Sequence, residues 1–156
     1  MLHVFMTDPR ITKLAKLLIE YSTQLQRGDR VLLDLIEVPD EIGVELIRAA
    51  RRVGAIPVVE ARHTRLGREM LLGADKKTSE LVRDIELFRM RKMQAYIAIR
   101  GSANANENAD VPSDRMSLHS RITRPVLNYR VNKTRWCVLR WPSPSMAQAA
   151  GMSTEA

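Results

Sequence analysis

The side chains best suited to catalysis or metal binding are few in this 156-residue chain, and they stand apart from one another. The chain has three histidines, His3, His63 and His119, and one cysteine, Cys137. Protein zinc sites need histidine, cysteine or carboxylate ligands that converge, as in a His-Glu-x-x-His pair on one helix face. None of the histidines has such a spacing. The sequence therefore predicts no metal site in these residues and assigns no catalytic or cofactor-binding residue.

Two polar groups follow expected strands. His63 comes after an expected strand at 56–61, and the loop 104–110, rich in Asn and Asp, follows one at 95–99. Ligands of open parallel sheets gather at the carboxyl ends of strands, so both could line a cleft. The alternatives are a surface histidine and side chains that satisfy the backbone of turns, and the sequence favours these alternatives.

Motifs for nucleotide binding and nucleophilic catalysis are missing from the sequence. It has no glycine-rich dinucleotide fingerprint after the first expected strand, no phosphate-binding loop and no Gly-x-Ser-x-Gly elbow. Cys137 falls in mid-strand between Trp136 and Val138, which favours an inert buried thiol over a nucleophile. A lone cysteine, no apolar run near the ~20 residues of a membrane span and no signal peptide favour a cytoplasmic protein without membrane contact.

The net charge of +7, from 25 basic and 18 acidic residues, permits nucleic-acid binding. Aromatic residues make up only 4% of the chain, so platforms for base stacking are scarce. One basic set lies in the last expected helix and at its end: Arg115, Arg121, Arg124, Arg130, Lys133 and Arg135. A solvated face, or a face that meets an acidic surface of another domain, is favoured over a nucleic-acid patch.

Hydrophobic periodicity and capping residues predict four main helices, at 9–26, 39–54, 77–93 and 112–132. Pro125 breaks or kinks the last of them. In the third, the residues expected to face inward are Leu81, Ile85, Leu87 or Phe88, and Met93. Between the second strand and this helix, Leu66, Met70 and Leu71 could form a short helix.

Dense apolar runs predict four strands, at 30–36, 56–61, 95–99 and 135–140. The first and the last read as buried strands, and Pro57 places its strand at an edge or at a strand start. Strands that alternate with helices favour an α/β fold with right-handed crossovers. We expect an open parallel sheet of four to five strands with helices on both faces, in a Rossmann-like or flavodoxin-like layering.

The end of the chain predicts its domain organisation. Trp141 with Pro142 and Pro144 could be an exposed interaction element, but packing of the strand's exit against the core is favoured. Ser153 is a good N-cap with Glu155 in the first turn of a helix that has no body before Ala156. We therefore expect residues 1–156 to be one N-terminal α/β domain of a longer chain.

Several segments match the sequence motifs of one family. They occur in the same order as in that family and extend along nearly the whole chain. They are Asp8-Pro-Arg-Ile-x-Lys-Leu-Ala-Lys-Leu-Leu18, Tyr21-Ser22, Gly28-Asp-Arg-Val-Leu32, Ala49-x-x-x-x-Gly54-Ala-x-Pro-Val-Val59, Asn104, Asp110-Val-Pro-Ser-Asp-Arg115, Arg135-Trp136, Trp141-Pro142-Ser-Pro144 and Met146-Ala-Gln-Ala-Ala-Gly-Met-Ser-x-Glu155. Together they resemble the aminopeptidase T family of metallopeptidases, the thermophilic-type leucyl aminopeptidases. Trp141 is a small departure, because a tyrosine often precedes that proline.

The resemblance implies a two-domain cytoplasmic exopeptidase that removes N-terminal residues from peptides. It implies two divalent metal ions, zinc or cobalt, bound by glutamates, histidines, a tyrosine and an aspartate of a C-terminal domain that is absent here. It also implies a homodimer. None of those ligands falls in a motif of this sequence, so the chain is expected to be the non-catalytic N-terminal domain, inactive alone, with its own C-terminal catalytic domain and peptide substrates as partners.

Two readings from other classes remain open in the sequence. The alternating fold and the positive charge suit a basic α/β nucleotide- or nucleic-acid-binding module, although nucleic acid is the less favoured partner. Such a module would lose affinity steeply as salt rises. A free-standing structural domain is the other reading, and the unfinished helix after Ser153 argues against it.

Overall fold

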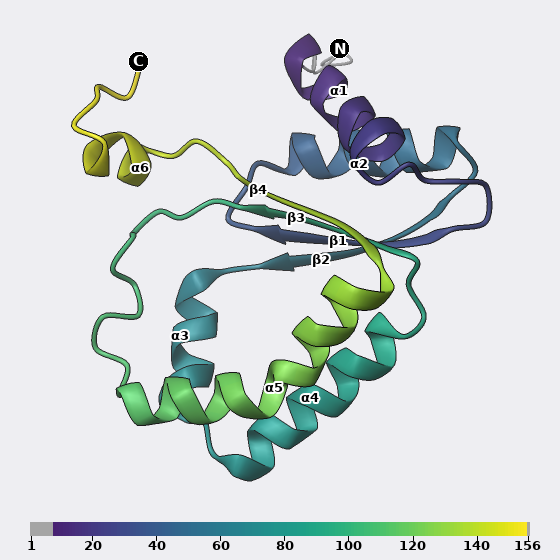
Figure 1. Cartoon of the computed structure of the whole chain (residues 1–156). Helices are drawn as coiled ribbons and strands as arrows, with labels where there is room; N and C mark the ends of the chain where they lie inside the picture. Colours follow the sequence, from purple (N-terminus) through teal and green to yellow (C-terminus); the bar gives the residue numbers. More distant parts are fainter. Residues whose placement is uncertain (1–7, 156) are drawn as a thin grey trace, which may run out of the picture.

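A computed structural model describes residues 8–155, which form a four-stranded parallel sheet with helices on both faces (Figure 1). The strands lie in the order β2-β1-β3-β4. Their bounds are β1 (Arg30–Ile36), β2 (Ile56–Arg62), β3 (Ala95–Arg100) and β4 (Arg135–Arg140). The predicted α/β class, with an open parallel sheet between helices, is confirmed with four strands.

The helices form two layers around the sheet. They are α1 (Pro9–Lys16), the π-helix η1 (Leu17–Ser22), α2 (Asp40–Arg52), α3 (Thr64–Leu72), α4 (Lys76–Met90), α5 (Ser113–Lys133) and the short α6 (Pro144–Ala149). Figure 1 shows α1 and α2 on one face of the sheet, and α3, α4 and α5 on the other. We call these the α1/α2 face and the α4/α5 face.

The larger core lies between the sheet and α1 and α2. Side chains alternate along a strand, so Val31, Leu33 and Leu35 of β1 point into this core while Leu32 points to the other side. Ile42 and Leu46 of α2 meet them and are fully buried. β1 is therefore covered on both faces, as its dense apolar run predicted.

The first helix changes character before it ends. Asp8 caps α1 by accepting a hydrogen bond from the Arg10 backbone N–H. The helix widens into η1 at Leu17 and stops at Ser22, four residues before the predicted end. The buried hydroxyl of Thr23 then donates to the Leu18 carbonyl oxygen at 2.8 Å, and the same oxygen accepts the Thr23 backbone N–H at 3.1 Å.

The α4/α5 face has a much smaller core. Its buried members are Leu32, Met90, Met93, Tyr96, Ala98 and Val126. Pro125 lies inside α5, which continues through it. Because proline has no N–H to donate to the preceding turn, it disturbs the helix there. Figure 1 shows α5 changing direction along its length, so the helix is kinked rather than broken.

Two burial predictions were wrong. Leu81 and Ile85 of α4 are 60% and 59% exposed, and α4 buries Ser79 and Met90 instead. Of the other residues expected to face inward, Leu87 (the alternative to Phe88, which is 67% exposed) and Met93 do pack in the α4/α5 core. β4 is only half-buried on one face and exposed on the other, which carries Trp136, 47% exposed, and Val138 at the edge of the sheet. The helix expected from Ser153 is not formed, since Thr154 and Glu155 lie in a turn.

Candidate functional site

The carboxyl ends of β1 and β3 meet at the point where the strand order reverses. β1 leads to β2 on one side, and β3 leads to β4 on the other. In open parallel sheets, the crevice outside the strand ends at such a reversal is the usual place for a ligand. Here the first residue after β1 is Glu37, which has a positive φ of 46°. Such a backbone conformation is uncommon for a residue with a side chain, and residues of this kind cluster at functional sites.

The Glu37 carboxylate connects two segments across the crevice. Its Oε1 accepts hydrogen bonds from the backbone N–H and the hydroxyl of Thr64, at the start of α3. Its Oε2 accepts a hydrogen bond from the Ala103 N–H, after β3, at 2.8 Å. These hydrogen bonds lower the pKa of Glu37, and the bond from the Thr64 hydroxyl contributes most. The Glu37 carboxylate is therefore ionised at neutral pH.

Close backbone packing fixes the same crevice. The Gly101 N–H donates to the Ile36 carbonyl oxygen at 2.7 Å. A Cβ at Gly101 would lie 2.2 Å from the Glu37 carbonyl oxygen. Only glycine allows the two chains to approach this closely. The crevice is therefore held by backbone contacts as well as by the carboxylate.

A cavity of about 520 Å³ opens beside Glu37. It is lined by Glu37, His63, Arg65, Leu66, Arg68, Glu69 and Glu107. His63 and the loop 104–110, predicted at the ends of two strands, are thus brought to one cavity. His63 is exposed, as the favoured surface interpretation predicted, and it also lines this cavity.

Most charges around this cavity pair with one another. Arg68 donates from Nε to the Asp110 carboxylate at 2.9 Å, and its Nη1 donates to Glu69 at 2.7 Å. The Arg68 guanidinium lowers the pKa of Asp110. The Asn104 side-chain amide donates to Glu107 at 3.2 Å. Asn104 Oδ1 also accepts the Asn106 backbone N–H at 3.0 Å, as the turn interpretation predicted, whereas Asp110 binds the Arg68 side chain.

The carboxylate of Glu37 bears on the nucleotide alternative. Phosphates in related architectures sit at a helix N-terminus beside the switch point, because backbone N–H groups point there. In this chain Glu37 already accepts the Thr64 N–H at the start of α3. A phosphate group at that place would meet a carboxylate, which disfavours nucleotide binding.

Replacing Glu37 with glutamine tests the role of this carboxylate. We expect a loss of about 1–2 kcal/mol in the free energy of unfolding at pH 7, because charge-assisted bonds become neutral ones. The folded pKa lies below the unfolded value near 4.3, so the stabilisation is complete above that pH and is lost as the pH falls through the folded pKa. Urea unfolding from pH 7 to pH 3 should show the difference from wild type shrinking. Glu69→Gln, an exposed carboxylate of the same cavity, is the control, and an equal effect there would contradict the assignment.

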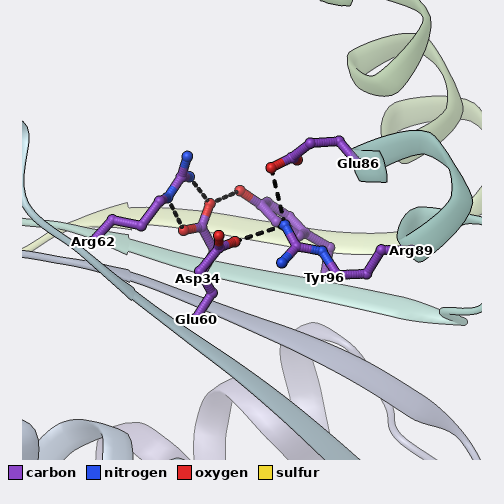
Figure 2. A network of polar contacts seen from close by, with 6 residues as sticks. All are labelled: Asp34, Glu60, Arg62, Glu86, Arg89 and Tyr96. Carbon is purple, nitrogen blue, oxygen red and sulfur yellow. Dashed lines mark hydrogen bonds and ion pairs between the residues drawn. The ribbon is translucent and has the colours of Figure 1, made fainter. Parts of the chain in front are cut away.

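A second polar cluster lies under the sheet, on its α4/α5 face (Figure 2). Asp34, in the middle of β1, is 1% exposed and forms a two-bond ion pair with Arg62 of β2. The Tyr96 hydroxyl donates to Asp34 Oδ2 at 2.5 Å. Burial and the nearby Asp34 charge raise the pKa of Tyr96 to about 12, so the phenol remains protonated and keeps donating.

The cluster extends to α4 and α5. Arg89 of α4 donates to Glu60 at 2.7 Å and to Glu86 at 3.1 Å, as Figure 2 shows. The guanidinium of Arg130, from α5, lies 3.8 Å from the centre of the Tyr96 ring. We call these seven residues the Asp34 cluster: Asp34, Glu60, Arg62, Glu86, Arg89, Tyr96 and Arg130. Its three carboxylates balance its three guanidinium groups, so it joins sheet to helices without an excess charge.

Other residues that the sequence singled out lie in structural contacts. His119 Nδ1 is 3.1 Å from the hydroxyl of Ser79, which is fully buried between α4 and α5. Cys137 is half-buried and packs against the α1/α2 core, as does Trp141, which confirms the favoured packing of the strand exit. His3 lies outside the described residues.

The basic set does not form one patch. Arg115 Nη1 donates to the Ala74 carbonyl oxygen, Arg130 stacks on Tyr96, and Arg135 pairs with Asp29. Arg121 and Arg124 remain at a shallow recess of α5. Because half of the set is engaged with the protein, the fold weakens the case for a nucleic-acid surface.

No group of three or more His, Cys, Asp or Glu side chains within residues 8–155 is arranged to hold a metal ion. The same part of the chain contains no helix of the length and apolarity that a bilayer crossing demands. Sequence reasoning missed Glu37 and Arg68. The available signal for Glu37 was its position as the first charged residue after the apolar run of β1.

The fold and this site define an α/β domain with an open parallel sheet and a polar crevice at its carboxyl end. The model of the thermophilic metalloprotease (M29) family matches residues 7–156, and the chain belongs to that family. The resemblance to the aminopeptidase T family seen in the sequence is thereby confirmed. No curated protein matches the chain.

Solved structures support the fold. The chain is similar to wild-type AmpT from Thermus thermophilus, with 21% identity and a TM-score of 0.71, over 94% of this chain and 40% of that one. It thus spans well under half of the length of AmpT. CurK enoyl reductase (12% identity, TM-score 0.43, 92% of this chain and 45% of that one) and a putative LacI-family repressor from Corynebacterium glutamicum (13%, 0.36, 83% and 59%) are weaker likenesses that carry no argument.

Proposed function

We propose that this chain is the N-terminal, non-catalytic domain of an aminopeptidase-type metalloprotease that removes N-terminal residues from peptides. The supporting observation is the family match over residues 7–156, taken with a donor set in residues 8–155 that does not fit a metal ion. A family defined by metal-dependent proteolysis needs its ligands somewhere. In this proposal they lie in a C-terminal domain that this sequence does not include.

The proposal carries further expectations for the longer protein. Two divalent ions, zinc or cobalt, would activate water and bind the attacking and leaving groups in that second domain. The partners are the chain's own catalytic domain, peptide substrates and a second copy in a homodimer. A cytoplasmic location accords with the single cysteine.

In this proposal the domain supports the catalytic domain and shapes the access of substrate to the active site. The sheet and the Asp34 cluster give a rigid body, and the crevice at Glu37 presents a polar cavity at one end of it. Peptide substrates have a charged amine and polar amides. A cavity with both carboxylates and guanidinium groups in its lining suits contact with such groups near the entrance to the active site.

Metal binding by residues 1–156 alone tests the proposal. Isothermal titration of the purified chain with Zn²⁺ and with Co²⁺ should show no stoichiometric site, because the donor set does not converge. The protein must carry no polyhistidine tag, since a purification tag binds both ions. One ion bound per chain with submicromolar affinity would contradict the proposal.

A further inference from the structure

α4 carries an apolar stripe on the side that faces away from its own protein. The stripe consists of Leu81, Ile85 and Phe88, all more than half exposed. Their spacing of i, i+4 and i+7 places them on one face of the helix. The inward face is formed by Ser79, Val82, Glu86 and Met90, at i, i+3, i+7 and i+11. With 3.6 residues per turn, the two faces lie on opposite sides of α4.

A stripe of this kind is unusual on a surface helix. Scattered single apolar residues are normal, but a contiguous row marks an interaction site. The row is continued at both ends by lysines, Lys77 before it and Lys92 after it. The Lys92 ammonium lies 5.3 Å from the centre of the Phe88 ring, and the Lys77 charge lies near the Asp75 carboxyl. A complementary surface would therefore be apolar in the middle and acidic at its ends.

We propose that the stripe Leu81–Ile85–Phe88 is the surface on which the C-terminal domain of the longer protein docks, through an apolar patch flanked by carboxylates. This inference rests on the proposed function. Its first support is the length of AmpT, of which this chain covers only 40%, so a family member has further chain to place.

The size of the stripe favours docking of the C-terminal domain over docking of a second copy of the chain. Stable association of separate proteins buries about 800 Å² on each partner. Three partly exposed side chains on one helix supply only a fraction of that area. A domain tethered in the same chain needs less contact, because the tether removes most of the entropic cost of association.

The docking experiment uses the longest product of the reading frame that begins at Met1. The photo-cross-linking residue benzoylphenylalanine replaces Ile85, and in a matched control it replaces Val44, an exposed apolar residue of α2 on the other layer. After irradiation, mass spectrometry of mixed light and heavy protein separates contacts within one chain from contacts between copies. We expect cross-links from position 85 to residues beyond 156 of the same chain, and none above background from position 44.

Each other outcome overturns the inference. Cross-links from position 85 to a second copy would make the stripe a dimer contact, and the absence of cross-links would leave the stripe uncovered. If the longer product hydrolyses peptides in either case, the proposed function stands while the docking face is wrong. A reading frame that ends at Ala156 would contradict both the proposed function and the docking surface.

A thermal measurement gives an independent readout. Ile85→Glu should change the melting temperature of residues 1–156 little, since the Ile85 side chain is already more than half exposed there. The same substitution should lower the melting temperature of the longer product, because it would bury a charge. A drop of equal size in both proteins would show that the stripe stabilises this domain itself and would overturn the inference.

Discussion

Replacing Asp34 with alanine is expected to lower the free energy of unfolding by about 3 kcal/mol, the largest effect of any single polar substitution in this domain. The carboxylate is almost fully buried in β1 and accepts bonds from Arg62 and Tyr96. Its removal leaves the Tyr96 hydroxyl buried without an acceptor. The Arg62 side chain is 42% exposed, so its charge can reach water, which keeps the loss at the lower end of the range for buried pairs.

Urea unfolding followed by circular dichroism measures this loss. Asp34→Asn should cost less than Asp34→Ala, because an amide oxygen can still accept from Tyr96. Asp84→Ala is the matched control, since Asp84 forms an ion pair with Arg83 on the exposed side of α4 and should change the stability by less than about 1 kcal/mol. Equal effects at positions 34 and 84 would mean that the Asp34 cluster does not join the sheet to α4 and α5.

Gly101→Ala is expected to cost about 3 kcal/mol, and it acts on the crevice directly. The new methyl group would lie 2.2 Å from the carbonyl oxygen of Glu37. A backbone carbonyl directly after a strand cannot move aside as a flexible side chain can, so the end of β3 must shift away from the end of β1. The Ala103 N–H would move with it and lose its bond to the Glu37 carboxylate.

Gly43→Ala is the control for this prediction. Its new methyl group would lie 2.8 Å from a methyl carbon of the Leu35 side chain, which can rotate. In the interior of a helix such as α2, alanine is also more favourable than glycine by about 1 kcal/mol, which offsets the crowding. Chemical denaturation of both variants should show a loss only at position 101. A stable Gly101→Ala protein would contradict the account of the crevice.

The strands could be predicted from the sequence because their signal is local. Arg30–Ile36 and Arg135–Arg140 are bounded as expected, and Pro57 lies on an edge strand as its missing N–H required. The partial exposure of β4 could not be predicted. A dense apolar run has the same appearance whether or not a helix covers its second face, and only the strand order decides this.

Long-range pairing explains what the sequence analysis missed at the site. Glu37 meets Thr64 and Ala103 from three separate segments, and no short motif encodes that meeting. The prediction that Leu81 and Ile85 face inward was wrong for a different reason, whereas Leu87, the alternative to Phe88, and Met93 do pack in the α4/α5 core. The spacing of Leu81 and Ile85 is that of a buried helix face, but the side chains are more than half exposed in this domain.

Hydrolysis of an aminoacyl-nitroanilide such as leucyl-p-nitroanilide, with and without a chelator, tests the central proposal most directly. Two purified proteins are compared, residues 1–156 and the longest product of the same reading frame, each with added Zn²⁺ or Co²⁺. The account predicts chelator-sensitive release of nitroaniline by the longer protein and none by residues 1–156. Chelator-sensitive turnover that stays with residues 1–156 through successive purification steps would contradict it.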